Sequence, residues 1–181
     1  KLRKPIIISD GFDPTNTRHF NELYDLLNRE NFIEKARAEG FDIVILDYTD
    51  GGDYIQRNAY VLISLINTIN SHLSYNHSAS QLIVIGRSMG GLISRYALYY
   101  MEQNLLTHNT RLYISFDSPH LGANIPLGDQ LWLDFFATYA GKQSAIDAIA
   151  QLNTPAAQQM LVYHFSSNSL RETLIKDINK L

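Results

Sequence analysis

Short apolar runs alternate with stretches of helical periodicity over the first 122 residues. Four of these runs end in turn residues and predict buried strands, at residues 5–9, 41–48, 81–86 and 111–116. The stretches between them repeat apolar side chains three and four positions apart and predict helices, at residues 17–39, 53–70 and 89–106. We expect the first helix to break near Asn31.

Strands that alternate with helices of this length are joined by right-handed crossovers and form a parallel sheet covered on both faces. The first part of the chain is therefore predicted to be an α/β fold. After Gly122 no convincing strand is present, and only helices are predicted, at about 126–140, 142–151, 155–164 and 168–180. We expect a division into a sheet-containing core, residues 1–122, and a helical cap or lid segment, residues 123–181.

Composition excludes several classes of function. The 181 residues suffice for one domain with a substantial core, and the formal net charge of −3 comes from both signs scattered along the chain. No block of Lys and Arg is present, so a nucleic-acid partner is not expected. No apolar run approaches the ~18 residues of a membrane span, so no transmembrane segment is predicted. Cysteine is absent, which excludes a disulfide framework and a cysteine nucleophile.

The sequence carries no signal for a compartment, a metal or a cofactor. The chain opens on Lys1 rather than Met, which indicates a processed or truncated start and leaves the localisation unassigned. Neither an H-E-x-x-H spacing nor a G-x-x-x-x-G-K phosphate loop occurs. We therefore expect no metal site and no organic cofactor.

One motif carries candidate chemistry. Residues 86–90 read Gly-Arg-Ser-Met-Gly and have the form G-x-S-x-G. A serine at the centre of this spacing occupies a sharp turn between a strand and a helix, which exposes its hydroxyl at the carboxyl edge of a sheet. The run QLIVI before the motif and the run LISRYALYYM after it predict that strand and that helix. Ser88 is therefore the candidate nucleophile, and the alternative is a glycine-rich turn with an N-capping serine.

A serine nucleophile needs fixed donors for the oxyanion that forms during attack. The backbone N–H of Met89, the residue after the serine, is one candidate donor, at the N-terminus of the following helix. The second candidate is the N–H of Phe12 in the loop after the first strand, where Gly11 permits a close backbone approach. The alternative for Asp10 and Gly11 is a plain turn.

The residues that carry this chemistry resemble those of the α/β-hydrolase superfamily. GRSMGGLISRYAL is similar to the elbow and following helix of lipases and esterases, and Ser118-Pro119-His120-Leu121-Gly122 is similar to a P-H-x-G segment in the same enzymes. The likeness covers residues 5–122 and is strongest to the triacylglycerol-lipase-like or GPI-inositol-deacylase-like branch. It implies a three-layer α/β-hydrolase-type parallel sheet, with the third to sixth family strands present and a helical cap at the C-terminal end.

The resemblance also implies two partners for the serine that the sequence does not display. The family order is serine, acid and histidine, with the last two after later strands. We expect them to lie beyond residue 181. The alternative is a partner inside the chain, such as His164, which falls in a predicted helix and is more simply a packed cap residue. Two further residues are candidates for a supporting or substrate-contacting role: His120 and Arg87, the latter pairing with a carboxylate or remaining solvated.

The sequence is compatible with three functions. The leading hypothesis is hydrolysis of a carboxylic ester with a lipophilic acyl chain, through an acyl-enzyme on Ser88, so that the partner would be a small-molecule or lipid ester. The aromatic and aliphatic residues after Gly122 favour an apolar acyl pocket. The alternatives are an α/β-hydrolase-like binding or interaction module without catalysis, and an acyltransferase or peptidase that uses the same elbow.

The predicted strand order leaves one strand exposed. With four strands, the fourth lies at an edge of the sheet with unpaired backbone groups. We expect this edge to associate with another copy of the chain, to be covered by the cap, or to pair with C-terminal strands outside these residues.

Overall fold

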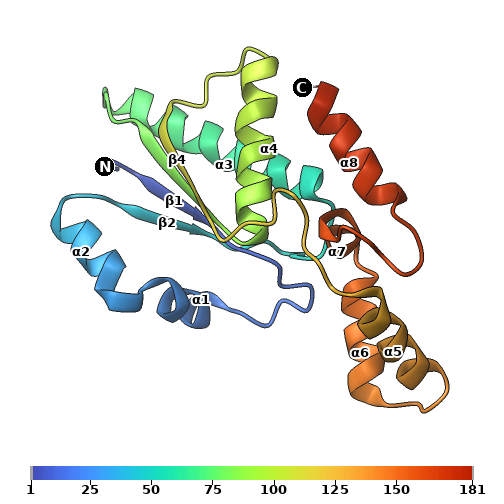
Figure 1. Ribbon diagram of the computed structural model, residues 1–181. Helices are drawn as coiled ribbons and strands as arrows, with labels where there is room; N and C mark the ends of the chain where they lie inside the picture. The colour runs from blue at the N-terminus through green and yellow to red at the C-terminus, as the bar shows by residue number, and fades with distance from the viewer. Residues whose placement is uncertain (1, 181) are drawn as a thin grey trace.

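The four strands form one parallel sheet in a computed structural model that describes residues 2–180. The order is β2 (Ile43–Leu46), β1 (Ile6–Ser9), β3 (Leu82–Arg87) and β4 (Thr110–Phe116), and all neighbouring pairs are parallel (Figure 1). All four strands lie within two residues of the positions expected from the apolar runs. The parallel sheet confirms the predicted α/β class.

Three helical connections join consecutive strands. Between β1 and β2 the chain forms α1 (Phe20–Leu27), a 3-10 turn (Arg29–Asn31) and α2 (Phe32–Ala38). The expected break near Asn31 is confirmed, because Glu30 and Asn31 have φ values of 55° and 56°, which a helix cannot accommodate. The later connections are α3 (Ile55–Tyr75) and α4 (Met89–Gln103).

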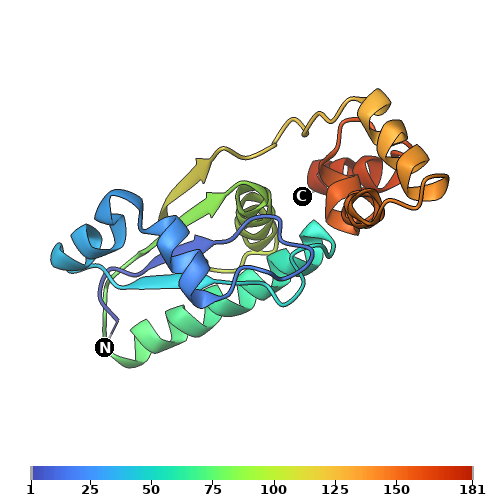
Figure 2. The same ribbon diagram turned by 90° about the horizontal axis from the view of Figure 1, so that it is seen from below.

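Side chains that alternate along the strands face two different helical layers. Ile7 and Val84 pack in the large buried cluster with α3 and α4. Ile6, Ile8 and Ile83 point the other way and pack near Leu27 and Ala36, on the side of α1 and α2. Figure 2 shows the sheet between these two layers. Both faces of β1 and β3 are therefore covered, which explains why these strands read as continuous apolar runs.

The described residues after β4 contain four helices: α5 (Leu127–Thr138), α6 (Gln143–Leu152), α7 (Pro155–Met160) and α8 (Ser169–Lys180). The paired helices α5 and α6 project from the body, whereas α8 lies alongside α4 (Figure 1). The helix expected at 155–164 ends at Met160. It ends early because Leu161 is extended and forms a bridge with Ala123, so that His164 is in a loop and not in a helix.

Two buried glutamines stabilise this helical part, Gln159 by hydrogen bonds to α3 and Gln130 by hydrogen bonds within the helical part itself. The Gln159 side chain accepts the N–H of Ile55 at 2.8 Å and donates to Gln56 at 2.8 Å. The Gln130 amide donates to the carbonyls of Ile125 and Tyr163. Both side chains are at most 1% exposed, and burial of a polar amide is tolerated only when such partners are present.

Strand β4 pairs with β3 only, among the residues that the structure describes. Its apolar side chains Leu112, Ile114 and Phe116 are exposed by 43%, 39% and 65%. A parallel edge of this kind presents unpaired backbone groups to any neighbouring strand. What associates with this edge stays a prediction.

Candidate active site

Ser88 lies at the turn between β3 and α4 in a strained backbone conformation. Its φ is 52° and its ψ is −127°, a combination that costs a non-glycine residue about 1–3 kcal/mol. The surrounding backbone holds it there: its N–H donates to Phe116 O at 2.9 Å, and its carbonyl accepts the N–H of Gly91 at 3.0 Å. This is the geometry that the G-x-S-x-G spacing predicts.

The glycines of the motif permit contacts that no side chain could. A Cβ at Gly86 would lie 2.4 Å from the Cα of Gly91, where β3 meets α4. A Cβ at Gly90 would lie 2.3 Å from the carbonyl oxygen of Ser9, at the end of β1. Both distances are far inside van der Waals contact. The elbow is therefore seated on the backbone of the neighbouring strand, not on side chains that can adjust.

The loop after β1 lies directly against Ser88. A Cβ at Gly11 would lie 3.0 Å from the Cβ of Ser88 and 3.4 Å from its Oγ. Phe12, the next residue, lines the same cavity as Ser88. The predicted oxyanion donor Phe12 and the predicted nucleophile are thus brought together, as are Ser88 and Met89 at the N-terminus of α4.

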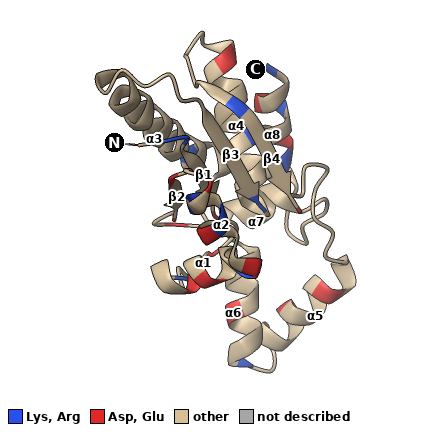
Figure 3. Cartoon of the chain, turned by 90° about the vertical axis from the view of Figure 1, so that its left-hand side faces the viewer, with Lys and Arg blue, Asp and Glu red and all other residues tan. Residues whose placement is uncertain are grey.

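Ser88 opens into a cavity of about 410 Å³ between the sheet and the helices after β4. We call it the Ser88 cavity. Apart from Ser88 and Gln151 its walls are apolar, and they comprise Phe12, Pro119, Ala123, Ile125, Leu133, Ala148, Leu152, Ala157, Met160 and Leu161. Helices α5 and α6, which supply part of this wall, carry few charges (Figure 3). The cavity has the size and lining of a site for an apolar small molecule.

His120 does not contact Ser88 through any hydrogen bond in the structure. Its Nε2 lies 2.6 Å from the hydroxyl of Ser115 on β4, and its Nδ1 is buried without a hydrogen-bond partner among residues 2–180. Burial, with the charge of Arg95, lowers the pKa of His120 below its ordinary value. The histidine therefore ties the loop after β4 to the strand itself.

His164 is a buried residue of the helical part, as one of the sequence alternatives anticipated. Its Nε2 donates to the carbonyl of Leu152 at 3.1 Å, and its Nδ1 accepts the N–H of Ser166 at 3.2 Å. Burial lowers its pKa, partly opposed by the hydrogen bond to Leu152. Both ring nitrogens are thus engaged with other residues of the helical part.

A charged cluster that sequence reasoning missed flanks the elbow. Asp10 is 1% exposed and contacts Arg18, 3.1 Å away, and Arg87, 3.7 Å away. Arg87 thus faces a carboxylate, the first of the two alternatives weighed for it. Arg18 precedes α1 in a polar loop, and no local pattern in the sequence connects it with Asp10.

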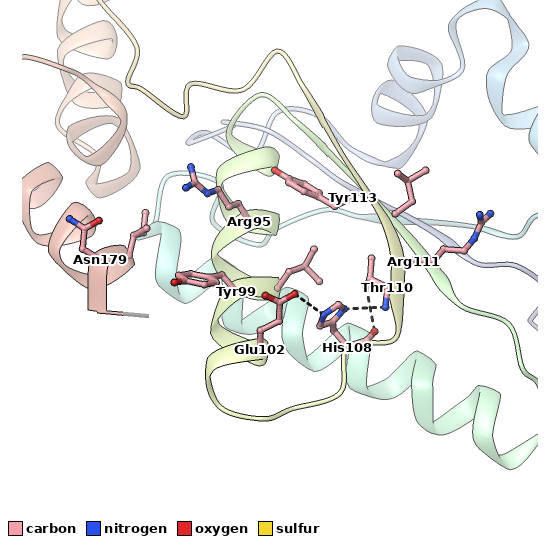
Figure 4. Close-up of a pocket in the computed structure, with 11 residues that line it drawn as sticks. Arg95, Tyr99, Glu102, His108, Thr110, Arg111, Tyr113 and Asn179 are labelled. Carbon is pink, nitrogen blue, oxygen red and sulfur yellow. Dashed lines mark hydrogen bonds and ion pairs between the residues drawn. The ribbon is translucent and has the colours of Figure 1, made fainter.

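A second, larger cavity of about 540 Å³ lies between β4, α4 and α8, and we call it the β4 cavity (Figure 4). Its wall mixes apolar side chains with charged ones, among them Arg95, Glu102, His108 and Arg111. His108 contacts Glu102 at 3.3 Å and accepts the N–H of Thr110 at 3.1 Å. It contains none of the residues that the sequence motif singles out.

Residues 2–180 contain no group of three or more histidine or acidic side chains arranged to bind a metal ion. Within the same range, no helix combines the length and apolar character needed to cross a bilayer.

Solved structures show the same fold. The crystal structure of the mature form of Bacillus licheniformis lipase BlEst2 superposes with a TM-score of 0.58 at 18% identity, over 98% of this chain and 60% of that chain. The propeptide form of the same lipase gives a TM-score of 0.53 at 20% identity, over 86% of this chain and 31% of that one. The chain thus spans less than two thirds of the length of the lipase that it resembles.

No curated protein matches the chain. The family model described as "PGAP1-like alpha/beta domain" matches residues 46–166. That range holds Ser88 and most of the helical part, and it begins after the loop that contains Phe12. The chain therefore belongs to the PGAP1-like alpha/beta domain family, and it shares its fold with the Bacillus lipase.

Proposed function

We propose that this chain is the nucleophile-bearing part of a serine hydrolase that cleaves carboxylic esters with an apolar acyl chain. The observation that carries the proposal is the opening of Ser88, held in its strained turn, into a cavity with an almost entirely apolar wall. In this proposal the cavity holds the acyl chain and the helices of residues 123–181 act as its cap. The core then comprises residues 1–122.

The proposed reaction begins with attack of Ser88 Oγ on the ester carbonyl. The N–H groups of Met89 and Phe12 stabilise the oxyanion, and the partial positive charge at the N-terminus of α4 adds to that stabilisation. Collapse of the intermediate releases the alcohol and leaves an acyl-enzyme, which water then hydrolyses.

A base must take the serine proton in this reaction. Within residues 2–180, no hydrogen bond joins Ser88 Oγ to a histidine, and the side chains of His120 and His164 are engaged with Ser115 and Leu152. We therefore take the base and its supporting acid from a segment outside these 181 residues.

Labelling with a fluorophosphonate probe tests the proposal. The natural protein that contains this chain should label at Ser88, and Ser88→Ala should abolish both labelling and hydrolysis of p-nitrophenyl octanoate. Ser71→Ala, at an exposed serine on α3, is the matched control and should change neither.

Each alternative gives a different result in that experiment. Labelling of the isolated 181-residue chain at the same rate would mean that the base lies within it and would contradict the assignment outside. A natural protein that neither labels nor hydrolyses esters would favour the binding module. Hydrolysis of amides in preference to esters would favour a peptidase.

A further inference from the structure

The loop after β1 carries a buried carboxylate that faces two guanidinium groups. The Asp10 side chain is 2% exposed, and its Oδ2 accepts a hydrogen bond from Arg18 Nη2 at 3.1 Å. Its Oδ1 faces Arg87 Nη1 at 3.7 Å and has no hydrogen-bond partner within residues 2–180. Burial of a carboxylate is costly and persists where opposite charge compensates it. We call these three residues the Asp10 clamp.

Arg18 connects the carboxylate to the backbone that bears the second oxyanion donor. The same Nη2 that contacts Asp10 also donates to the carbonyl oxygen of Phe12, at 2.9 Å. The amide and the carbonyl of Phe12 flank one Cα, with only two soft dihedral angles between them. A carbonyl held in place therefore restricts how far the amide of the same residue can turn away from Ser88.

Arg18 is itself held at its backbone. Asp13 accepts the N–H of Arg18 at 2.8 Å and the hydroxyl of Thr17 at 3.0 Å. Burial works to raise the pKa of Asp13, but these hydrogen bonds and the charge of Arg18 outweigh it and lower the pKa. On its other side Asp13 packs against Gly51, where a Cβ would lie 2.7 Å from the Asp13 carbonyl oxygen. These contacts fix the backbone of the loop on both sides of Asp13 and hold Arg18 in place.

Arg87 extends the clamp to the elbow. It immediately precedes Ser88, so its attraction to Asp10 joins the segment that carries the nucleophile to the segment that carries Phe12. The pair is at 3.7 Å and the Arg87 side chain is 32% exposed, so it contributes less than the hydrogen-bonded contact of Arg18.

We propose that Asp10 and Arg18 are positioning residues that hold the Phe12 amide at the oxyanion position, with Arg87 as a weaker tie to the elbow. The proposal rests on the proposed function. Loss of an oxyanion donor lowers kcat by about 10²- to 10³-fold. A donor that remains present but is held less firmly should lower kcat by a smaller factor. Disruption of the clamp should therefore lower kcat by about tenfold to hundredfold.

Arg18 offers the sharper test because its side chain is 27% exposed and is not part of the hydrophobic core. In the natural protein, Arg18→Met removes both contacts and should lower kcat for p-nitrophenyl octanoate by at least about tenfold, with KM changed less than about threefold. Arg18→Lys should restore most of the loss, because a single nitrogen makes both contacts and an ammonium can replace it.

The matched control is another Arg–Asp pair of the same separation. Arg57 Nη1 and Asp53 Oδ1 are also 3.1 Å apart, on the exposed start of α3. Arg57→Met should leave kcat and KM unchanged. Asp10→Asn, which keeps the shape of the side chain and removes its charge, should lower kcat in the same direction as Arg18→Met.

A tetrahedral boronic acid inhibitor separates positioning from general destabilisation. Its affinity should fall by the same factor as kcat/KM in Arg18→Met, because its adduct uses the same donors as the transition state. Unchanged kcat and inhibitor affinity in a folded Arg18→Met protein would overturn the proposal, and so would an Arg18→Lys protein as impaired as Arg18→Met. If the unaltered protein itself neither hydrolyses the ester nor labels at Ser88, the proposed function fails first and the clamp proposal fails with it.

Discussion

The Ser88 cavity and the β4 cavity are of similar size, but they lie at opposite ends of the parallel strands. The former lies beyond the carboxyl end of β3, whereas the latter includes Thr110, the first residue of β4. Ligands of open parallel sheets bind outside the carboxyl ends of the strands. The larger volume, about 540 Å³ against about 410 Å³, is thus at the less favourable end.

The two regions also differ in how tightly the surrounding contacts fix the positions of their backbone atoms. Beside Ser88, glycines allow backbone to meet backbone, and buried charges fix the adjoining loop. At the β4 cavity the charged contact is a partly exposed pair, His108 with Glu102, of the kind that contributes about 1 kcal/mol or less. The comparison teaches that the Ser88 cavity is distinguished from the β4 cavity by how tightly the backbone around it is fixed, and not by its volume.

The largest effect is expected from Gly90→Ala. Its new Cβ would meet the carbonyl oxygens of Ser9 and Asp10 at 2.3 and 2.4 Å, and backbone atoms cannot move aside cheaply. We expect the free energy of unfolding in urea to fall by about 2–3 kcal/mol. Gly128→Ala, in the open first turn of α5, is the control and should raise it by up to ~1 kcal/mol. An equal change in the free energy of unfolding at the two glycines would contradict the tighter packing proposed around Ser88.

A smaller effect is expected when the Ser88 cavity is filled. Ala148→Phe places a ring in the cavity wall and should lower kcat/KM for an octanoyl ester by about tenfold, while that for an acetyl ester changes less than about threefold. Asn179→Phe in the β4 cavity is the control and should alter neither. A loss shared by both esters would contradict the assignment of the cavity to the acyl chain.

The smallest effect is expected from pH. Burial lowers the folded-state pKa of His164, so between that pKa and the ordinary value of about 6.5 the unfolded chain binds more protons than the folded one. The free energy of unfolding should therefore be fully retained above pH ~7.5 and fall as the pH drops below ~6.5. His164→Gln should flatten this slope in thermal melts between about pH 8 and pH 5, leaving the part due to His120. An unchanged slope would contradict a buried neutral His164.

The strands and the elbow could be predicted because their signals are local. A doubly covered strand must be apolar throughout, as Ile6–Ile8 is, and a strained serine turn needs glycine on both sides. The end of the helix at Met160 could not be predicted in this way. It depends on pairing of Leu161 with Ala123, 38 positions earlier, while the local pattern remained compatible with a helix.

The Asp10 clamp was beyond sequence reasoning for a related reason. Asp10 and Gly11 have the composition of an ordinary turn, and Arg18 that of a solvated loop residue. Only the folded loop brings the guanidinium to the carboxylate and to the carbonyl of Phe12. The two histidines illustrate the reverse case: the sequence pointed to a packed residue at His164 and to a supporting or substrate-contacting residue at His120, and the hydrogen bonds connect them to Leu152 and to Ser115.

Gln130, one of the two buried glutamines, has a consequence for how the sequence of this family can vary. Gln130 bonds only to main-chain groups, at Ile125, Tyr163 and Phe165, and every amino acid supplies such groups. The side chains around it are therefore free to diverge between homologues, while the glutamine itself has no substitute of equal reach and bonding capacity. The helices after β4 can therefore exchange side chains that line the Ser88 cavity without losing their own arrangement.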